Sequence, residues 1–193
     1  MSTYLLAFCV SDFHFISDQN AKFSVWARAG AIATANYSLD VGPKILQYYE
    51  NYFNISYPLP KMDMVAVPDL NAGAMENWGL IIYRETAMLY DPSVSSSHNL
   101  QRVATVIGNG YPFRLNEGFA SFMEYEGVNA VHPKWQMSQQ FVVDEIHDVF
   151  ELDCLTTSHP ISVPVHNPDE INEIFDRISY GKGASIIRMM TYF

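Results

Sequence analysis

The spacing of apolar residues changes along this chain, and that change most limits the folds it can adopt. Up to residue 85 most apolar stretches are short and rich in β-branched and aromatic residues, whereas after residue 95 apolar residues recur at helical spacing. Strands that precede the helices, rather than alternate with them, favour an α+β fold. With 49% hydrophobic residues among 193, the chain has enough apolar material for an ordinary folded core.

Four short stretches in the first part of the chain have the alternation and composition of β-strands. They are residues 4–10 and 22–28, which we expect to pair antiparallel, and residues 62–68 and 79–85. Residues 36–53 instead place apolar side chains at helical spacing, and Pro58 and Pro60 end that pattern. Further helices are predicted at residues 97–107, 117–128, 133–150 and 182–193.

The first two predicted strands are too few to form a stable sheet alone. We therefore predict that residues 1–28 are the C-terminal strands of an N-terminal β domain, and that residues 29–193 form a second, partial domain. The expected fold class is α+β, with the end of a β-sheet domain followed by a domain that is mostly helical after residue 95.

The composition argues against several partners. A formal net charge of −10 disfavours nucleic acid and anionic membrane surfaces, because basic patches bind both. No stretch approaches the roughly 20 apolar residues of a membrane helix, and no basic residues precede the apolar run at residues 4–10, as they would in a secretory signal. The spacing of the two cysteines, Cys9 and Cys154, predicts neither a disulfide framework nor a metal site, and we expect buried thiols.

Five motifs follow one another in an order that is more informative than any one of them. They are GAMENWGL at residues 73–80, YRETAMLYDP, RLNEGFASFMEY, TTSHPISVPV and FDRISYGKGAS. In sequence and in order these blocks closely resemble the zinc aminopeptidases of the aminopeptidase N type, across nearly the whole chain. The resemblance implies that residues 29–193 are part of a thermolysin-like catalytic domain, a gluzincin, that removes N-terminal residues from peptides.

The resemblance assigns the first block to substrate binding. Glu76 corresponds to the glutamate that binds the free α-ammonium group of the substrate, a task that suits a carboxylate because the hydrogen bond is charge-assisted. The other residues of the block are Gly73, Ala74, Met75 and Asn77, and their backbone would lie along the peptide as a strand-like edge. Peptides are therefore the expected partners.

The later blocks correspond to a metal ligand and an oxyanion donor. In gluzincins two histidines of an HExxH motif and a glutamate on the following helix hold zinc, and a fourth position is left for water. By resemblance Glu117 corresponds to that glutamate, and Tyr180 corresponds to the tyrosine that donates a hydrogen bond to the tetrahedral oxyanion. Zinc is thus the cofactor of the parent family.

The HExxH motif itself is absent. Where the family has it, only GNGYPFR separates Ile107 from Leu115, so we predict an internal deletion between residues 107 and 115. No histidine has a second one four residues away, the spacing that places two imidazoles on one helix face, and catalytic zinc needs three protein ligands. The chain is therefore predicted not to bind zinc and to be inactive. The histidines, interpreted as surface or hydrogen-bonded structural residues, are His14, His98, His132, His147, His159 and His166.

Other interpretations stay open. The chain can instead be a non-catalytic protein that binds peptide N-termini through the GAMEN edge, or it can keep some activity with a different set of metal ligands. Taken singly, Glu76 fits an ordinary turn, Tyr180 a buried aromatic residue and Glu117 a helix start favoured by the dipole. Family members are often membrane-anchored, extracellular or lumenal, but the sequence leaves compartment, oligomeric state and residue preference open.

Overall fold

The computed structural model describes residues 3–111 and 117–193. The chain divides into two compact units, Met1–Pro112 and Phe113–Phe193. The described part of the first unit contains a mixed β-sheet and three α-helices, and the described part of the second is helical. This arrangement of a sheet followed by helices confirms the α+β prediction.

The sheet of the first unit has five strands in the order β1-β2-β3-β5-β4. Its strands are β1 (His14–Ser17), β2 (Phe23–Ala27), β3 (Met62–Val67), β4 (Ala74–Met75) and β5 (Leu80–Arg84). The central pairs β2–β3 and β3–β5 are parallel, while β1 and β4 pair antiparallel at the two edges. The β1–β2 hairpin was predicted, but with its first strand at residues 4–10.

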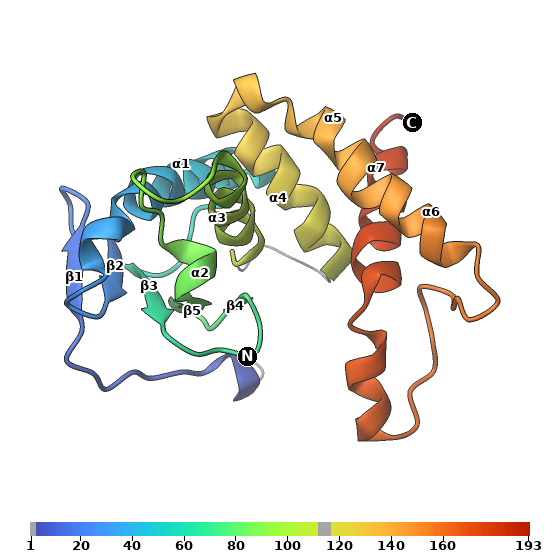
Figure 1. The fold of residues 1–193 in the computed structure, drawn as a ribbon, viewed down its shortest axis with the longest axis horizontal. Helices are drawn as coiled ribbons and strands as arrows, with labels where there is room; N and C mark the ends of the chain where they lie inside the picture. Colours follow the sequence, from blue (N-terminus) through green and yellow to red (C-terminus); the bar gives the residue numbers. More distant parts are fainter. Residues whose placement is uncertain (1–2, 112–116) are drawn as a thin grey trace. The chain divides into compact units, whose positions relative to one another are not determined.

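Three helices pack on one face of this sheet (Figure 1). They are α1 (Asn36–Phe53), α2 (Glu85–Met88) and α3 (Ser97–Asn109), and the short η2 (Ile32–Ala35) precedes α1. Val25, Met64 and Ile81 are in register across β2, β3 and β5 and are almost fully buried. The core of the first unit therefore lies between this sheet face and the helices, and α1 has the bounds that its apolar spacing predicts.

The second unit packs α4 (Glu117–Val131) against α5 (Met137–Phe141) and α7 (Gly183–Met190). Short helical segments join these helices: η3 (Pro133–Trp135), the π-helix η4 (Val142–His147), α6 (Asp148–Asp153), η5 (Pro168–Ile174) and the π-helix η6 (Ile178–Lys182). The two π-helices contact each other. π-helices are rare and often occur at functional sites.

Several local predictions were wrong. Residues 4–10 form no strand: η1 (Thr3–Leu5) is followed by an extended segment, because alternation makes a strand only where a neighbouring strand is available. The helix predicted at residues 133–150 is interrupted at Gln136, whose φ of 53° is left-handed. Cys9 and Cys154 are exposed rather than buried, since one lies in the extended segment and the other ends α6.

The domain boundary predicted at residue 28 stays a prediction. The strands on either side of it, β2 and β3, are neighbours in the same sheet.

In the described residues no helix is both long and apolar enough to cross a membrane.

Tyr111, the last described residue of the first unit, closes its core. Its side chain is 2% exposed, and its hydroxyl donates a hydrogen bond to the carbonyl oxygen of Gly42 at 2.7 Å. The Tyr49 hydroxyl donates to the Gly108 carbonyl at 3.1 Å, and the two tyrosine rings meet edge to face with centroids 5.9 Å apart. Burial raises the pKa of Tyr111 well above its ordinary value. The end of α3 is thereby tied to α1 by neutral, buried hydroxyl groups.

Replacing Tyr111 by phenylalanine tests this tie. Tyr111→Phe removes the buried hydroxyl that donates to the Gly42 carbonyl, and we expect it to lower the free energy of unfolding by about 0.5–1.5 kcal/mol. Urea unfolding followed by circular dichroism measures the change. Tyr52→Phe is the matched control, because Tyr52 lies on the same helix α1 and is 50% exposed, and it should change stability by less than about 0.5 kcal/mol. Equal effects of the two variants would contradict this account.

Candidate functional site

The GAMEN block lies at one edge of the sheet. Ala74 and Met75 form β4, which pairs antiparallel with Tyr83 and Ile82 of β5. The carbonyl oxygen of Gly73 accepts a hydrogen bond from the Arg84 N–H at 3.0 Å. Because the backbone groups of successive strand residues point to alternate sides, the N–H and C=O of Ala74 face away from β5. The block was predicted as a turn between strands, and the structure makes part of it an edge strand.

Arg84 fixes the loop that leads into this edge. Its Nε donates a hydrogen bond to the Leu70 carbonyl oxygen at 2.6 Å. A second guanidinium nitrogen donates to the same oxygen and to the Asn71 carbonyl at 3.4 Å. A fork of charged donors on adjacent carbonyls gives a well-defined loop geometry, so the start of β4 is held from the end of β5.

The N-terminal segment holds the turn that carries Glu76. The Trp78 N–H donates to the Leu5 carbonyl oxygen at 2.9 Å, and the Asn77 side-chain amide donates to the Tyr4 carbonyl at 3.2 Å. Asn77 is only 5% exposed, whereas Glu76 is half-buried. The structure therefore anchors the residue after Glu76 and leaves the Glu76 side chain in partial contact with solvent.

Glu117 is the first residue of α4, in the second unit. The residue after it, Gly118, lies against the backbone of Gly183 at the start of α7. A Cβ atom on Gly118 would lie 2.9 Å from the Gly183 carbonyl carbon and 3.2 Å from the Ala184 nitrogen. Side chains do not fit at such separations, so the glycines of the NEG and GKG motifs allow α4 and α7 to touch backbone to backbone.

A cavity of about 190 Å³ opens beside this contact. Its lining joins the first turn of α4 to the segment from η5 to η6, and the lining residues are Glu117, Gly118, Ile161, Ile174, Phe175 and Ser179. The carboxylate of Glu117 thus shares a largely apolar cavity with the residue that precedes Tyr180.

Tyr180 lies within the π-helix η6. Its N–H donates to the Asp176 carbonyl oxygen at 3.1 Å, and its ring is tilted against that of Phe175 with centroids 6.4 Å apart. The side chain is half-buried.

The neighbouring π-helix η4 supports η6 through Glu145, which is 6% exposed. The Tyr125 hydroxyl donates to Glu145 Oε1 at 3.2 Å, and Arg177 donates to Glu145 Oε2 at 3.4 Å and to Asp148 at 2.7 Å. A Cβ atom on Gly181 would lie 2.7 Å from Glu145 Oε2, so glycine is required there too. Burial raises the pKa of Glu145, with Arg177 and the Tyr125 hydrogen bond opposing the shift.

The predicted site residues therefore fall in two groups. Glu117 and the Tyr180 segment belong to the second unit, where the cavity brings them together. Gly73, Ala74, Met75, Glu76 and Asn77 belong to the first unit. Asn116 of the NEG motif and residues 112–115 of the interval predicted for the deletion lie outside the described residues.

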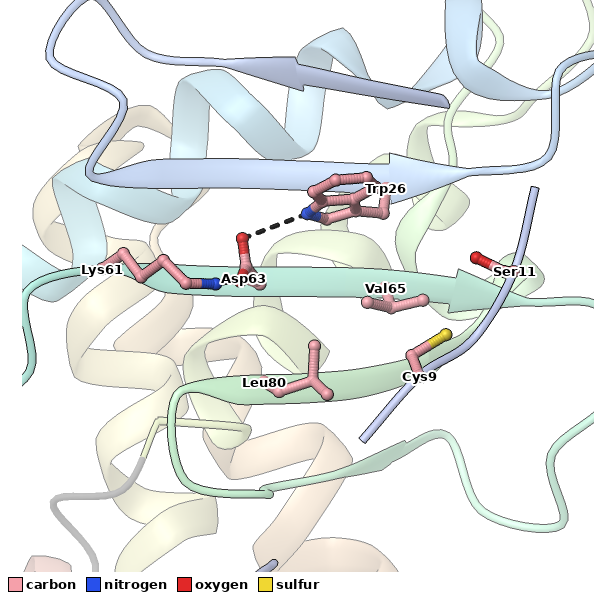
Figure 2. A pocket seen from close by; sticks show the side chains of 7 residues that line it. All are labelled: Cys9, Ser11, Trp26, Lys61, Asp63, Val65 and Leu80. Carbon is pink, nitrogen blue, oxygen red and sulfur yellow. Dashed lines mark hydrogen bonds and ion pairs between the residues drawn. The ribbon is translucent and has the colours of Figure 1, made fainter. Parts of the chain in front are cut away.

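A second cavity, of about 290 Å³, lies on the sheet face opposite the helices (Figure 2). Here Trp26 donates to Asp63 at 3.0 Å, and Lys61 pairs with the same carboxylate. These polar groups bind one another, and nothing links this cavity to the predicted site. It is lined by Cys9, Ser11, Trp26, Lys61, Asp63, Val65 and Leu80.

Glu117 is the one residue that the resemblance assigns to a zinc site. Among the described residues no group of three or more His, Cys, Asp or Glu side chains is placed to hold a metal ion. Residues 112–116, outside the described part, contain none of these four residue types. A catalytic zinc site uses three protein ligands, and Glu117 supplies one.

Sequence analysis missed the residues that hold η6, namely Glu145, His159, Asp176 and Lys182. His159 was interpreted as a surface or structural histidine, and it is indeed hydrogen-bonded, to Asp176. The one signal for this contact in the sequence was that His159 and Asp176 each lie in one of the five family motifs, SHP and FDRISYGKG.

Comparison with known proteins follows the same division of the sequence. The model of the peptidase family M1 domain matches residues 37–110 and 111–193. The chain is 47% identical to an aminopeptidase A of Gloydius brevicauda over 98% of its length. It is 44% and 43% identical to the aminopeptidases N of Bos taurus and Homo sapiens over its full length. It spans 22% of the length of each of these relatives. The chain therefore belongs to peptidase family M1, which confirms the resemblance found in the motifs.

The helix contact at Gly118 yields a test of the site's packing. Gly118→Ala places a methyl group within 3 Å of the α7 backbone, and we expect it to destabilise the chain by about 1–3 kcal/mol, although alanine is the better helix former. Urea unfolding measures the change. Gly30→Ala is the control, because a Cβ atom at Gly30 meets nothing within 4 Å. A Gly118→Ala variant as stable as the native chain would show that α4 and α7 are not in backbone contact.

Proposed function

We propose that this chain is part of a zinc aminopeptidase, an enzyme that removes N-terminal residues from peptides, and that it does not hydrolyse peptides in the form given by its sequence. The zinc-binding HExxH segment is absent, and Glu117 alone cannot hold catalytic zinc. The chemistry belongs to the parent family, and the chain retains the substrate edge, one metal ligand and the oxyanion donor.

The place where the family match breaks is the observation that carries this proposal. The family model matches in two pieces that meet between residues 110 and 111, inside the interval predicted for the deletion. The alignment with bovine aminopeptidase N covers 216 positions, although the chain has 193 residues. The relative therefore has at least 23 residues in that alignment without a counterpart here. A stretch of that size can hold the HExxH motif and the residues after it.

Glu76 and the β4 edge are proposed to bind the substrate. The half-buried carboxylate of Glu76 would accept the α-ammonium group, and the outward N–H and C=O of Ala74 would pair with the peptide backbone by strand addition. Gly73, Met75 and Asn77 complete the edge. Anchoring of Asn77 and Trp78 by the N-terminal segment supports this role, because it fixes the turn on which Glu76 sits.

Glu117 and Tyr180 are proposed as the remaining residues of the catalytic centre. In the parent enzyme Glu117 would be the third zinc ligand, and the Tyr180 hydroxyl would donate a hydrogen bond to the tetrahedral oxyanion. Glu117 lines a cavity together with Ser179, the residue before Tyr180, and this supports a shared site. We also keep the domain assignment as a proposal, with residues 1–28 ending an N-terminal β domain and residues 29–193 forming a partial thermolysin-like domain.

Zinc stoichiometry and hydrolysis of an aminoacyl-anilide test the proposal. After dialysis against trace zinc, the purified chain should carry almost no zinc and should not hydrolyse the anilide. The matched variant has the HExxH block of bovine aminopeptidase N inserted between Ile107 and Leu115, and it should bind zinc. Adding Glu117→Gln to that variant should remove one of its three ligands and weaken zinc binding by at least about tenfold.

The outcomes separate the interpretations. One tightly bound zinc ion per native chain would overturn the proposal and would require a different ligand set. Anilide hydrolysis by the native chain that a chelator abolishes would do the same. Zinc bound equally by the repaired chain with and without Glu117→Gln would remove Glu117 from its proposed role.

The β4 edge also favours a second candidate function, the binding of peptide N-termini without catalysis. On this hypothesis calorimetry should detect binding of a short peptide amide, and N-acetylation of the peptide should abolish it, because acetylation removes the charge that Glu76 would accept. Glu76→Gln should weaken binding by about tenfold or more, whereas Asp69→Asn, an exposed acid before the same edge, should not. Absence of binding by the stable native chain would exclude this function.

A further inference from the structure

The start of the π-helix η6 is capped by a single carboxylate. Asp176 Oδ1 accepts hydrogen bonds from the N–H groups of Ile178 and Ser179, both at 3.0 Å, and the Asp176 carbonyl accepts from the N–H of Tyr180. The first N–H groups of a helix have no partner within the helix, and here a side-chain carboxylate accepts two of them. The orientation of Asp176 therefore sets the first turn of η6, on which Tyr180 lies.

The other oxygen of Asp176 is held by His159. His159 Nε2 lies 2.8 Å from Asp176 Oδ2, and His159 Nδ1 lies 2.8 Å from the Pro160 carbonyl oxygen. A carboxylate and a carbonyl oxygen both only accept hydrogen bonds, so the two contacts are made together only when both ring nitrogens carry a proton. The geometry of His159 is that of an imidazolium cation.

Other charged groups surround this pair. At the far end of η6, Lys182 Nζ binds Asp153 Oδ1 at 2.7 Å, and the Ser158 hydroxyl donates to the same oxygen at 2.7 Å. The charge of Lys182 acts to lower the pKa of His159, and the charge of His159 acts to lower the pKa of Asp153. On the side of η4, Arg177 pairs with Glu145 and Asp148. The segment from Asp153 to Pro160 thus contacts η6 at both ends.

We propose that His159 and Asp176 are positioning residues for Tyr180, and that the imidazolium–carboxylate pair keeps the first turn of η6 in the arrangement that the structure shows. Loss of the His159 proton removes one of its two hydrogen bonds and the charge that orients Asp176. Asp176 Oδ1 still accepts from the N–H groups of Ile178 and Ser179, but Oδ2 has lost its cationic partner and the carboxylate is less firmly oriented. The orientation of Tyr180 therefore depends on the protonation of a histidine that contacts η6 through Asp176.

The pKa values of His159 and Asp176 define the pH range in which this ion pair is intact. Hydrogen bonds to the Pro160 carbonyl and to Asp176 raise the pKa of His159 above its ordinary value of 6.5. Partial burial acts to raise the pKa of Asp176, but the Ser179 N–H and His159 outweigh it and lower that pKa below 3.8. The His159 contribution is complete below 6.5 and is lost as the pH rises through its raised pKa. The Asp176 contribution is complete above 3.8 and is lost as the pH falls through its lowered pKa.

That Tyr180 is an oxyanion donor rests on the proposed function, but the contact between His159, Asp176 and η6 does not. The test therefore uses the native chain without zinc or substrate. If the NMR test fails, the positioning role of His159 and Asp176 is wrong, but the conclusions from the zinc and peptide experiments still hold. If the zinc and peptide experiments fail, the result of the NMR test still holds.

The test is an NMR titration of the native chain labelled with ¹⁵N-histidine and ring ¹³C-tyrosine, with signals assigned through His159→Gln and Tyr180→Phe. At pH 6 both ring nitrogens of His159 should carry protons. The His159 midpoint should lie above the ordinary histidine value of 6.5. The Tyr180 ring signals should shift with the His159 midpoint, because the cap of η6 changes when His159 loses its proton.

Two variants complete the test. Asp176→Asn removes the acceptor charge, so the His159 midpoint should fall towards 6.5 and the Tyr180 signals should no longer follow it. His166→Gln, at an exposed histidine of the same unit, should leave the pH dependence of the Tyr180 signals unchanged. Tyr180 signals that stay constant through the His159 titration of the native chain would overturn the proposal, and so would a His159 midpoint at or below 6.5. Both of these results come from the native fold, so a variant that fails to fold cannot hide them.

Discussion

The backbone contact between Gly118 and Gly183 is the constraint on which the site of the second unit depends. Two helices approach this closely only where neither carries a side chain. The contact places the start of α4, with Glu117, against the start of α7, which directly continues η6 and Tyr180. In each motif the glycine stands within three residues of the side chain that carries the proposed chemistry. The glycines therefore bring the helix start that carries Glu117 close to the segment that carries Tyr180, and Glu117 lines one cavity with Ser179 of that segment.

Local periodicity was enough to predict the elements whose burial repeats regularly. The helix at residues 36–53 and the strands at residues 62–68 and 79–85 have almost the predicted bounds, because one face of each is buried against a single neighbouring layer. Residues 4–10 show the limit of this reasoning, since alternation cannot reveal whether a partner strand exists. The predicted helix at residues 133–150 shows another limit: the left-handed Gln136 and the π-helix η4 interrupt the regular α-helix, and no periodicity signals either of them.

The sequence was enough to propose the candidate site residues, but not the contacts that hold them in place. Collinear motifs identified Glu76, Glu117 and Tyr180 because the resemblance extends across nearly the whole chain, and the family match agrees with it. The residues that support them were invisible in the sequence. His159 and Asp176 are 17 positions apart in a segment with little regular structure, and their pairing follows from how the segment folds back on η6. Supporting contacts of this kind combine residues that have no common pattern, so only coordinates identify them.

The predicted deletion and the division of the chain into two units coincide, and this explains how the fold can survive the loss of the chemistry. The boundary between the units follows residue 112, in the interval where the family carries the two zinc-binding histidines. In a gluzincin these histidines precede the boundary and the third ligand, here Glu117, follows it, so metal binding would couple the two parts of the domain. Without that segment each unit relies on its own core. In the first unit Tyr111 closes the end of α3 on α1, and in the second the glycine contact joins α4 to α7. Neither contact uses a metal ion, so the stability of each unit is compatible with the proposed lack of zinc-dependent hydrolysis.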